Sequence, residues 1–178
     1  MAHELSITAI GADQPGVVAG VTGALAALNA NLLDTSMTIL GGRFAMVLIV
    51  SVPKNVQAEA VENALEEPAS RLGLDVSVHE SSVTSPAGSG ERFSVSVYGG
   101  DKPGIVHRFA QALAEAQVNI TDLSTRFLGD SDTPVYAMLL DVAFPPGLTI
   151  EAVRGTLSAL AKELDVEFSI NSADADIL

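Results

Sequence analysis

The sequence predicts an α+β protein built from two similar βαββαβ domains in tandem. Residues 11–36 align with residues 99–124 without a gap, and 11 of the 26 paired positions are identical, where chance would give about one or two. Each copy also shows the same order of strand-like and helix-like hydrophobic patterns. Between the copies, the stretch ESSVTSPAGSGE has the composition of a flexible linker. Because only two copies are present, a tandem pair is favoured over a solenoid.

These observations predict one domain at residues 1–80, a Ser/Gly/Pro linker at residues 81–91 and a second domain at residues 92–178. Farther along the alignment the offset between the copies increases by four. FAMVLIV at residues 44–50 then pairs with YAMLLDV at residues 136–142. We therefore expect a longer hairpin in the second domain.

The first domain begins with ELSITAI at residues 4–10, whose alternation is typical of a strand with one buried face. From Pro15 to Leu28, apolar residues recur every three or four positions, which predicts a helix. Residues 32–40 and 43–52 are rich in residues that favour strands. The Gly41-Gly42 pair between them suits a tight turn with positive φ.

A second helix is predicted over residues 55–72, where Pro68 should kink or break it, and a strand over residues 74–78. The second domain repeats this order at 92–98, 103–117, 120–127, 135–142, 149–164 and 165–170. Right-handed crossovers place both helices of each domain on one face of a four-stranded antiparallel sheet, the ferredoxin-like arrangement. The other face stays open, so each domain has a surface for association with its sibling or another chain.

Composition and charge exclude several classes of function. The net charge of −13 and the scatter of the nine basic residues argue against direct nucleic-acid binding. The absence of cysteine excludes thiolate catalysis, disulfides and cysteine-bound zinc. The longest apolar run, residues 44–50, is too short to span a membrane. Because the first residues lack the pattern of a secretory signal, we expect a cytoplasmic protein.

A similar turn motif occurs in both copies, as Asp13-Gln14-Pro15-Gly16 and Asp101-Lys102-Pro103-Gly104. In a structural interpretation the aspartate caps the following helix, the proline occupies its first turn and the glycine permits a close approach of the backbone. In a functional interpretation, the helix amides bind a carboxylate and the aspartate pairs with an ammonium group. The predicted amides belong to Gly16, Val17 and Val18 in the first domain, and to Gly104, Ile105 and Val106 in the second.

Such a turn offers both halves of the zwitterion of a free amino acid. The field of a helix end contributes only about 0.3–1 kcal/mol, whereas micromolar binding needs about 8 kcal/mol. Further contacts must therefore come from a facing surface of the other repeat or of another chain.

The D-[QK]-P-G-[VI]-V turn, the apolar helix and the motifs Asn31 to Asp34 and Asn119 to Asp122 resemble the ACT-domain family. The resemblance covers residues 4–80 and 92–171 and implies small regulatory modules that typically bind amino acids. The two-module layout is similar to the glycine cleavage system transcriptional repressor family. That similarity implies a protein partner, a transcription activator, with glycine as the signal.

The two turns differ in charge. If one turn pairs directly with a carboxylate, we expect the second to do so through Lys102, near His107 and Arg108. Alternatively, these three residues form an ordinary solvated surface. Asn31 and Asn119 are expected to be left-handed turn residues after a helix, or else ligand contacts.

No residues have the spacing of a catalytic site, so we expect a non-enzyme without cofactor. His3, His79 and His107 lie too far apart in the sequence for metal-ligand spacing, and GDSDTP at residues 129–134 is expected to be an enlarged hairpin turn and not a calcium loop. The predicted function is an amino-acid sensor that controls a transcription factor or metabolic enzyme, with homo-oligomers expected. A ligand-independent interaction module and a detached regulatory subunit are the alternatives.

Overall fold

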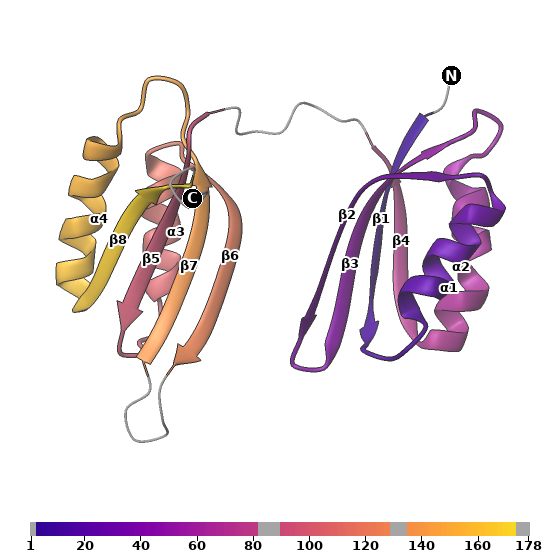
Figure 1. Cartoon of the computed structure of the whole chain (residues 1–178), viewed down its shortest axis with the longest axis horizontal. Coiled ribbons are helices and arrows are strands. Elements are labelled where there is room, and N and C mark those ends of the chain that lie inside the picture. The colour runs from indigo at the N-terminus through magenta and orange to yellow at the C-terminus, as the bar shows by residue number, and fades with distance from the viewer. Residues whose placement is uncertain (1–2, 82–89, 129–134, 174–178) are drawn as a thin grey trace. The chain divides into compact units, whose positions relative to one another are not determined.

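The computed structural model describes residues 3–81, 90–128 and 135–173 (Figure 1). The chain divides into two compact units, residues 1–84 and 85–178. The GDSDTP stretch at residues 129–134 and most of the predicted linker lie outside the described residues.

Each unit has the predicted βαββαβ order, and both of its helices cover one face of its sheet (Figure 1). The first unit contains β1 (His3–Ala12), α1 (Val17–Ala27), β2 (Asn31–Leu40), β3 (Arg43–Val52), α2 (Ala58–Leu72) and β4 (Leu74–Glu80). The second contains β5 (Arg92–Gly99), α3 (Ile105–Glu115), β6 (Asn119–Leu128), β7 (Val135–Ala143), α4 (Ile150–Leu164) and β8 (Val166–Ser172). The sheets are antiparallel with orders β2-β3-β1-β4 and β6-β7-β5-β8. The predicted α+β class and ferredoxin-like topology are confirmed.

Each unit has its own apolar core between the helices and the sheet. In the first unit, alternate residues such as Leu5 and Ile7 of β1 pack with Leu48 of β3 and with Val21 and Leu25 of α1. None of the polar or charged side chains in the described part of the chain is buried. Burial of apolar surface therefore provides most of the stabilisation of each unit.

Of the two outcomes predicted for Pro68, a kink or a break in the second helix, the break is wrong. α2 continues through Pro68 to Leu72. Pro68 lacks the N–H that would continue the helical hydrogen bonds, but its ring is buried. A Cβ atom built on Gly20 of α1 would lie 3.5 Å from the Pro68 Cβ. The close approach of the two helices at this point offsets the lost hydrogen bond by apolar contact.

The left-handed residues after the first helix of each unit are Asn29 and Gln117, with φ of 55° and 58°. The expectation that Asn31 and Asn119 occupy these turns is therefore wrong. Both are instead the first residues of their strands, where Asn31 pairs with Ser51 and Asn119 with Ala143. Each strand therefore begins two residues after the left-handed residue of its turn.

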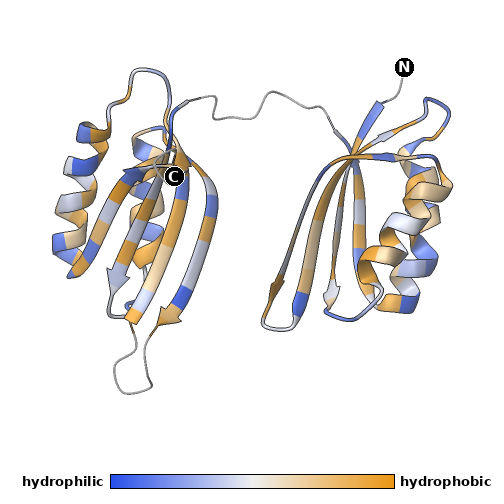
Figure 2. Ribbon diagram, viewed as in Figure 1, coloured by the Kyte–Doolittle hydropathy of each residue, from blue (hydrophilic) through white to orange (hydrophobic). Residues whose placement is uncertain are grey.

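The β2–β3 hairpin turns at Gly41 and Gly42, which have the predicted positive φ of 56° and 75°. β2 is an edge strand, and all ten of its residues are exposed. Hydrophobic residues lie along the strands of its sheet (Figure 2). Leu40, the last residue of β2, is 78% exposed. A long apolar edge of this kind favours pairing with another strand.

Within the described ranges, none of the helices is long and apolar enough to cross a bilayer.

Candidate functional site

The repeated turn joins the first strand of each unit to its first helix. Gly16 and Gly104 are the N-cap residues of α1 and α3, with φ of 96° and 93°. In the part of the chain that the structure describes, no side chain caps either helix, so the predicted capping by Asp13 and Asp101 is wrong. A Cβ atom on either glycine would meet nothing within 4 Å. These glycines are therefore required for their left-handed backbone and not for a close approach.

The N-terminus of α1 leaves several backbone amides available. The first hydrogen bond of the helix runs from the Gly20 N–H to the Gly16 carbonyl oxygen, at 2.8 Å. The amides of Gly16, Val17, Val18 and Ala19 precede this bond and have no partner inside the helix. They lie next to the Asp13 turn, as the functional interpretation requires.

α3 begins similarly, with a 2.9 Å bond from the Arg108 N–H to the Gly104 carbonyl oxygen. Here, however, the Ile105 N–H already donates to the Lys102 carbonyl oxygen at 3.5 Å. Pro15 and Pro103 precede the N-cap glycines, so each proline shapes the turn and is not part of the helix.

The residue after each aspartate fixes the turn to the second helix of its unit. Gln14 Nε2 donates to the carbonyl oxygen of Leu72, the last residue of α2, at 2.7 Å. Lys102 Nζ donates to the carbonyl oxygen of Leu164, the last residue of α4, at 2.8 Å. We refer to these two bonds as the turn–helix bonds. Each satisfies a carbonyl oxygen that has no partner within its helix.

The second turn–helix bond has an electrostatic component that the first lacks. Lys102 Nζ lies 3.6 Å from Asp165 Oδ2, and Arg108 Nη2 lies 2.8 Å from Glu163 Oε2. Both basic groups thus have partners within their own unit. This arrangement disfavours the expected preference for Lys102 as the group that binds a carboxylate.

Replacing Gln14 with alanine is expected to lower the free energy of unfolding of the first unit by about 1 kcal/mol, because the Leu72 carbonyl oxygen loses its donor. Gln14→Lys, which installs the residue of the second unit, should retain most of the stability. Chemical denaturation followed by circular dichroism measures both changes. A Gln14→Ala variant as stable as the wild type would show that water replaces the bond without cost.

A hollow of about 430 Å³ opens beside the first turn. Its lining residues are Asp13, Gln14, Gly16, Val17, Val18, Ala19, Met37 and Phe44. The Asp13 N–H donates to the Gly42 carbonyl oxygen at 3.0 Å, which holds the turn against the β2–β3 hairpin. Among the described residues, the Asp13 carboxylate has no hydrogen-bond or ion-pair partner.

Sequence reasoning missed two lining residues, Met37 and Phe44. They come from β2 and β3, and strand pairing brings them to the helix-covered side of the sheet. Met37 is opposite Met46, whose side chain is buried in the core. The alternation of side chains along β2 and β3 indicates which residues share a face. Placing Met37 and Phe44 beside the turn also requires the register of the β2–β3 hairpin.

The sequence matches the ACT domain over residues 3–79 and again over residues 91–171. The chain belongs to the ACT-domain family. This tandem ACT protein is 24% identical over 171 residues to the glycine cleavage system transcriptional repressor of Escherichia coli. The aligned residues cover 95% of this chain and 90% of that protein. A UPF0237 protein of Methanopyrus kandleri is 41% identical over 78 residues, which cover 43% of this chain and 87% of that protein. A crystal structure of an unknown protein from Galdieria sulphuraria has a TM-score of 0.84 at 28% identity, covering 97% of this chain and 99% of that one.

In this ACT protein, Asn31 does not line the hollow. Its predicted role as a ligand contact therefore has no support from the geometry of the first unit. Asn119 is likewise the exposed first residue of β6.

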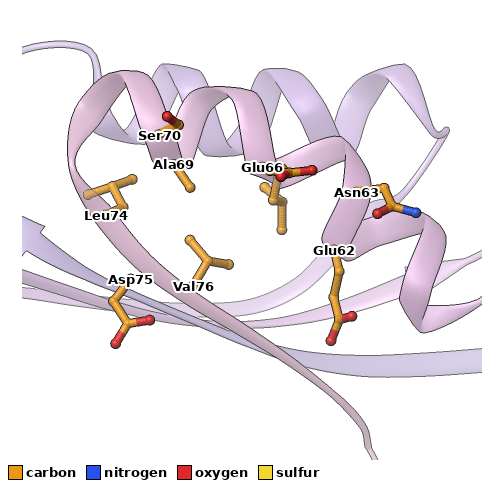
Figure 3. Close-up of a pocket in the computed structure, with 9 residues that line it drawn as sticks. Glu62, Asn63, Glu66, Ala69, Ser70, Leu74, Asp75 and Val76 are labelled. Atoms are coloured by element: carbon orange, nitrogen blue, oxygen red, sulfur yellow. The ribbon is translucent and has the colours of Figure 1, made fainter.

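A second hollow of the ACT protein, of about 560 Å³, lies between α2 and β4 (Figure 3). The acidic residues Glu62, Glu66 and Asp75 contribute to its lining. Figure 3 shows that their carboxylates do not converge on one point. Within the described ranges, no group of three or more His, Cys, Asp or Glu residues could hold a metal ion. We assign this hollow no function.

Proposed function

We propose that the protein is an amino-acid-responsive regulator that binds its ligand in the hollow beside Asp13 and acts by contact with another protein. The supporting observation is the Asp13 carboxylate, which has no partner among the described residues and lies in one lining with the N-terminus of α1. The carboxylate is suited to the ammonium group of an amino acid, and the amides of Val17, Val18 and Ala19 are suited to its carboxylate.

The first turn is the better candidate of the two. Among the described residues, the first turn has no counterpart of the bond by which the Ile105 N–H of the second unit contacts the Lys102 carbonyl oxygen. The ammonium group of Lys102 is also engaged by Leu164 and Asp165. In this proposal, the second domain provides a structural or partner-binding surface.

Micromolar binding needs more contacts than one turn provides, and a second chain paired along the edge strand β2 would supply them. Met37 lines the hollow and belongs to this edge. A strand from a second chain paired along β2 would lie beside the hollow and add contacts to the ligand. We therefore propose a homo-oligomer in which ligand binding and strand pairing stabilise each other.

A regulatory role is consistent with the similarity to the glycine cleavage system transcriptional repressor of Escherichia coli. The partner in this proposal is a transcription regulator or a metabolic enzyme. The net charge of −13 disfavours direct contact with nucleic acid. The protein itself performs no catalysis in this proposal.

A thermal-shift screen of the full chain with the twenty amino acids tests the proposal. At 100 times its dissociation constant, a ligand should stabilise the protein by about 2.7 kcal/mol. Asp13→Asn keeps the shape of the side chain and removes its charge, so it should weaken binding roughly 10- to 150-fold, as loss of a charged hydrogen bond of about 1.5–3 kcal/mol does.

Asp101→Asn is the matched control, because Asp101 occupies the same position in the second turn. It should leave the ligand-induced shift unchanged. If no amino acid stabilises the protein at millimolar concentration, a ligand-independent interaction module becomes the better description. If Asp101→Asn alone abolishes the shift, the site is in the second domain.

A further inference from the structure

We propose that the hollow beside Asp13 selects amino acids with aliphatic side chains, of the size of leucine or methionine, over glycine. This inference rests on the proposed function, because it concerns the side chain of a ligand held by its ammonium and carboxylate groups. It is based on the chemistry of the apolar residues in the lining.

The hollow contains one charged group, and that group is assigned to the ligand ammonium. Apart from Asp13, Gln14 and Gly16, its lining consists of Val17, Val18, Ala19, Met37 and Phe44. The side-chain nitrogen of Gln14 already donates to Leu72. The side chain of the ligand therefore meets apolar groups, against which a polar or charged side chain would lose its hydration without a partner.

Three of these apolar residues, Val18, Ala19 and Met37, are exposed in the protein. Val18 is 41% exposed and Met37 is 47% exposed, whereas Phe44 and Val17 are buried. A volume of about 430 Å³ is within the range of small-molecule sites. Glycine has no side chain and would leave Val18 and Met37 in water. Each methylene of a longer ligand that is buried here should raise affinity roughly fourfold.

The second domain shows that the fold does not itself require this apolar lining. The offsets of the repeat place His107, Thr125 and Tyr136 at the positions of Ala19, Met37 and Phe44. The side chains of all three residues contain polar atoms. The apolar character of the first hollow is therefore a property of its own residues, and the second domain supplies natural substitutions for testing it.

Isothermal titration of the full chain with glycine, leucine, methionine and aspartate tests the inference. Leucine or methionine should bind at least tenfold more tightly than glycine or aspartate. Met37→Thr installs the residue of the second domain on an exposed strand. It should reduce the affinity for leucine and methionine at least fivefold, with little change for glycine.

Val18→Thr gives a second variant of nearly the same shape and should act in the same direction. Thr125→Met is the matched control and should change none of these affinities. Glycine binding as tightly as leucine, with dependence on Asp13, would overturn the aliphatic selectivity and leave the proposed function intact. Binding of none of the four amino acids would overturn the aliphatic selectivity, and the thermal-shift screen with all twenty decides separately whether the proposed function stands. Equal losses for all four ligands in Met37→Thr would also overturn the selectivity.

Discussion

Leu48→Ala is expected to lower the free energy of unfolding of the first unit by about 2–5 kcal/mol and to leave the second unit unchanged. Leu48 is fully buried on β3, the strand between β2 and β1. Its side chain belongs to the core cluster of the first unit, which shares no residue with the cluster of the second. Truncation leaves a cavity that the surrounding side chains fill only in part.

The two tyrosines of the sequence make this prediction easy to measure. Tyr98 and Tyr136 both belong to the second unit, and the chain contains no tryptophan. Tyrosine fluorescence therefore follows unfolding of the second unit, while far-ultraviolet circular dichroism follows both. In urea, Leu48→Ala should shift part of the dichroism transition to lower concentration without moving the fluorescence midpoint.

Leu140→Ala is the reciprocal control, because Leu140 of β7 matches Leu48 in the repeat and is 1% exposed. It should lower the fluorescence midpoint. A fluorescence midpoint that falls equally in both variants would show that the two units unfold as one cooperative body.

Replacing glycine with alanine is expected to change the stability of the first unit in opposite directions at residues 11 and 23. Gly11→Ala should destabilise the first unit by about 1–3 kcal/mol, as overpacking of a core does. A Cβ atom at Gly11 would lie 2.8 Å from the Gly73 carbonyl oxygen and 2.7 Å from Leu74 Cδ2. Gly11 is held between β3 and β4 by strand pairing, so its backbone has little freedom to move away.

Gly23→Ala should instead stabilise the first unit by about 0.5–1 kcal/mol. Gly23 lies inside α1, and a Cβ atom there would meet nothing within 4 Å. Alanine restricts the unfolded chain and favours the helix without a clash. Thermal unfolding of both variants checks the pair, and a gain in stability from Gly11→Ala would show that β4 moves to accommodate the methyl group.

The repeat made most of the fold predictable. Once residues 11–36 and 99–124 were aligned, each strand and helix in one copy had an independent counterpart in the other, and local periodicity supplied the rest. The prediction failed where tertiary packing overrides local preference. Pro68 remains inside a helix with its ring buried, where α1 comes so close that a Cβ atom on Gly20 would lie 3.5 Å from the Pro68 Cβ, and no local pattern near residue 68 contains that approach.

The candidate site was predictable only in its polar half. Asp13 and Gly16 were found from the turn motif, but α1 begins at Val17 with Gly16 as its N-cap, so Asp13 lies three residues before the capping position. Met37 and Phe44 were missed because they reach the hollow through strand pairing, 24 and 31 residues beyond Asp13 in the chain. Contacts of that kind require a register, which composition and spacing do not provide.

The turn–helix bonds change how the repeated motif should be defined. The residue after the aspartate of the turn needs a side chain that is long enough to reach a carbonyl oxygen and able to donate a hydrogen bond. Glutamine and lysine both meet this requirement. Glutamate has a similar length, but when ionised it would bring an acceptor to an acceptor. A search for this turn in other chains should therefore specify a donor at that position and leave its charge free to vary.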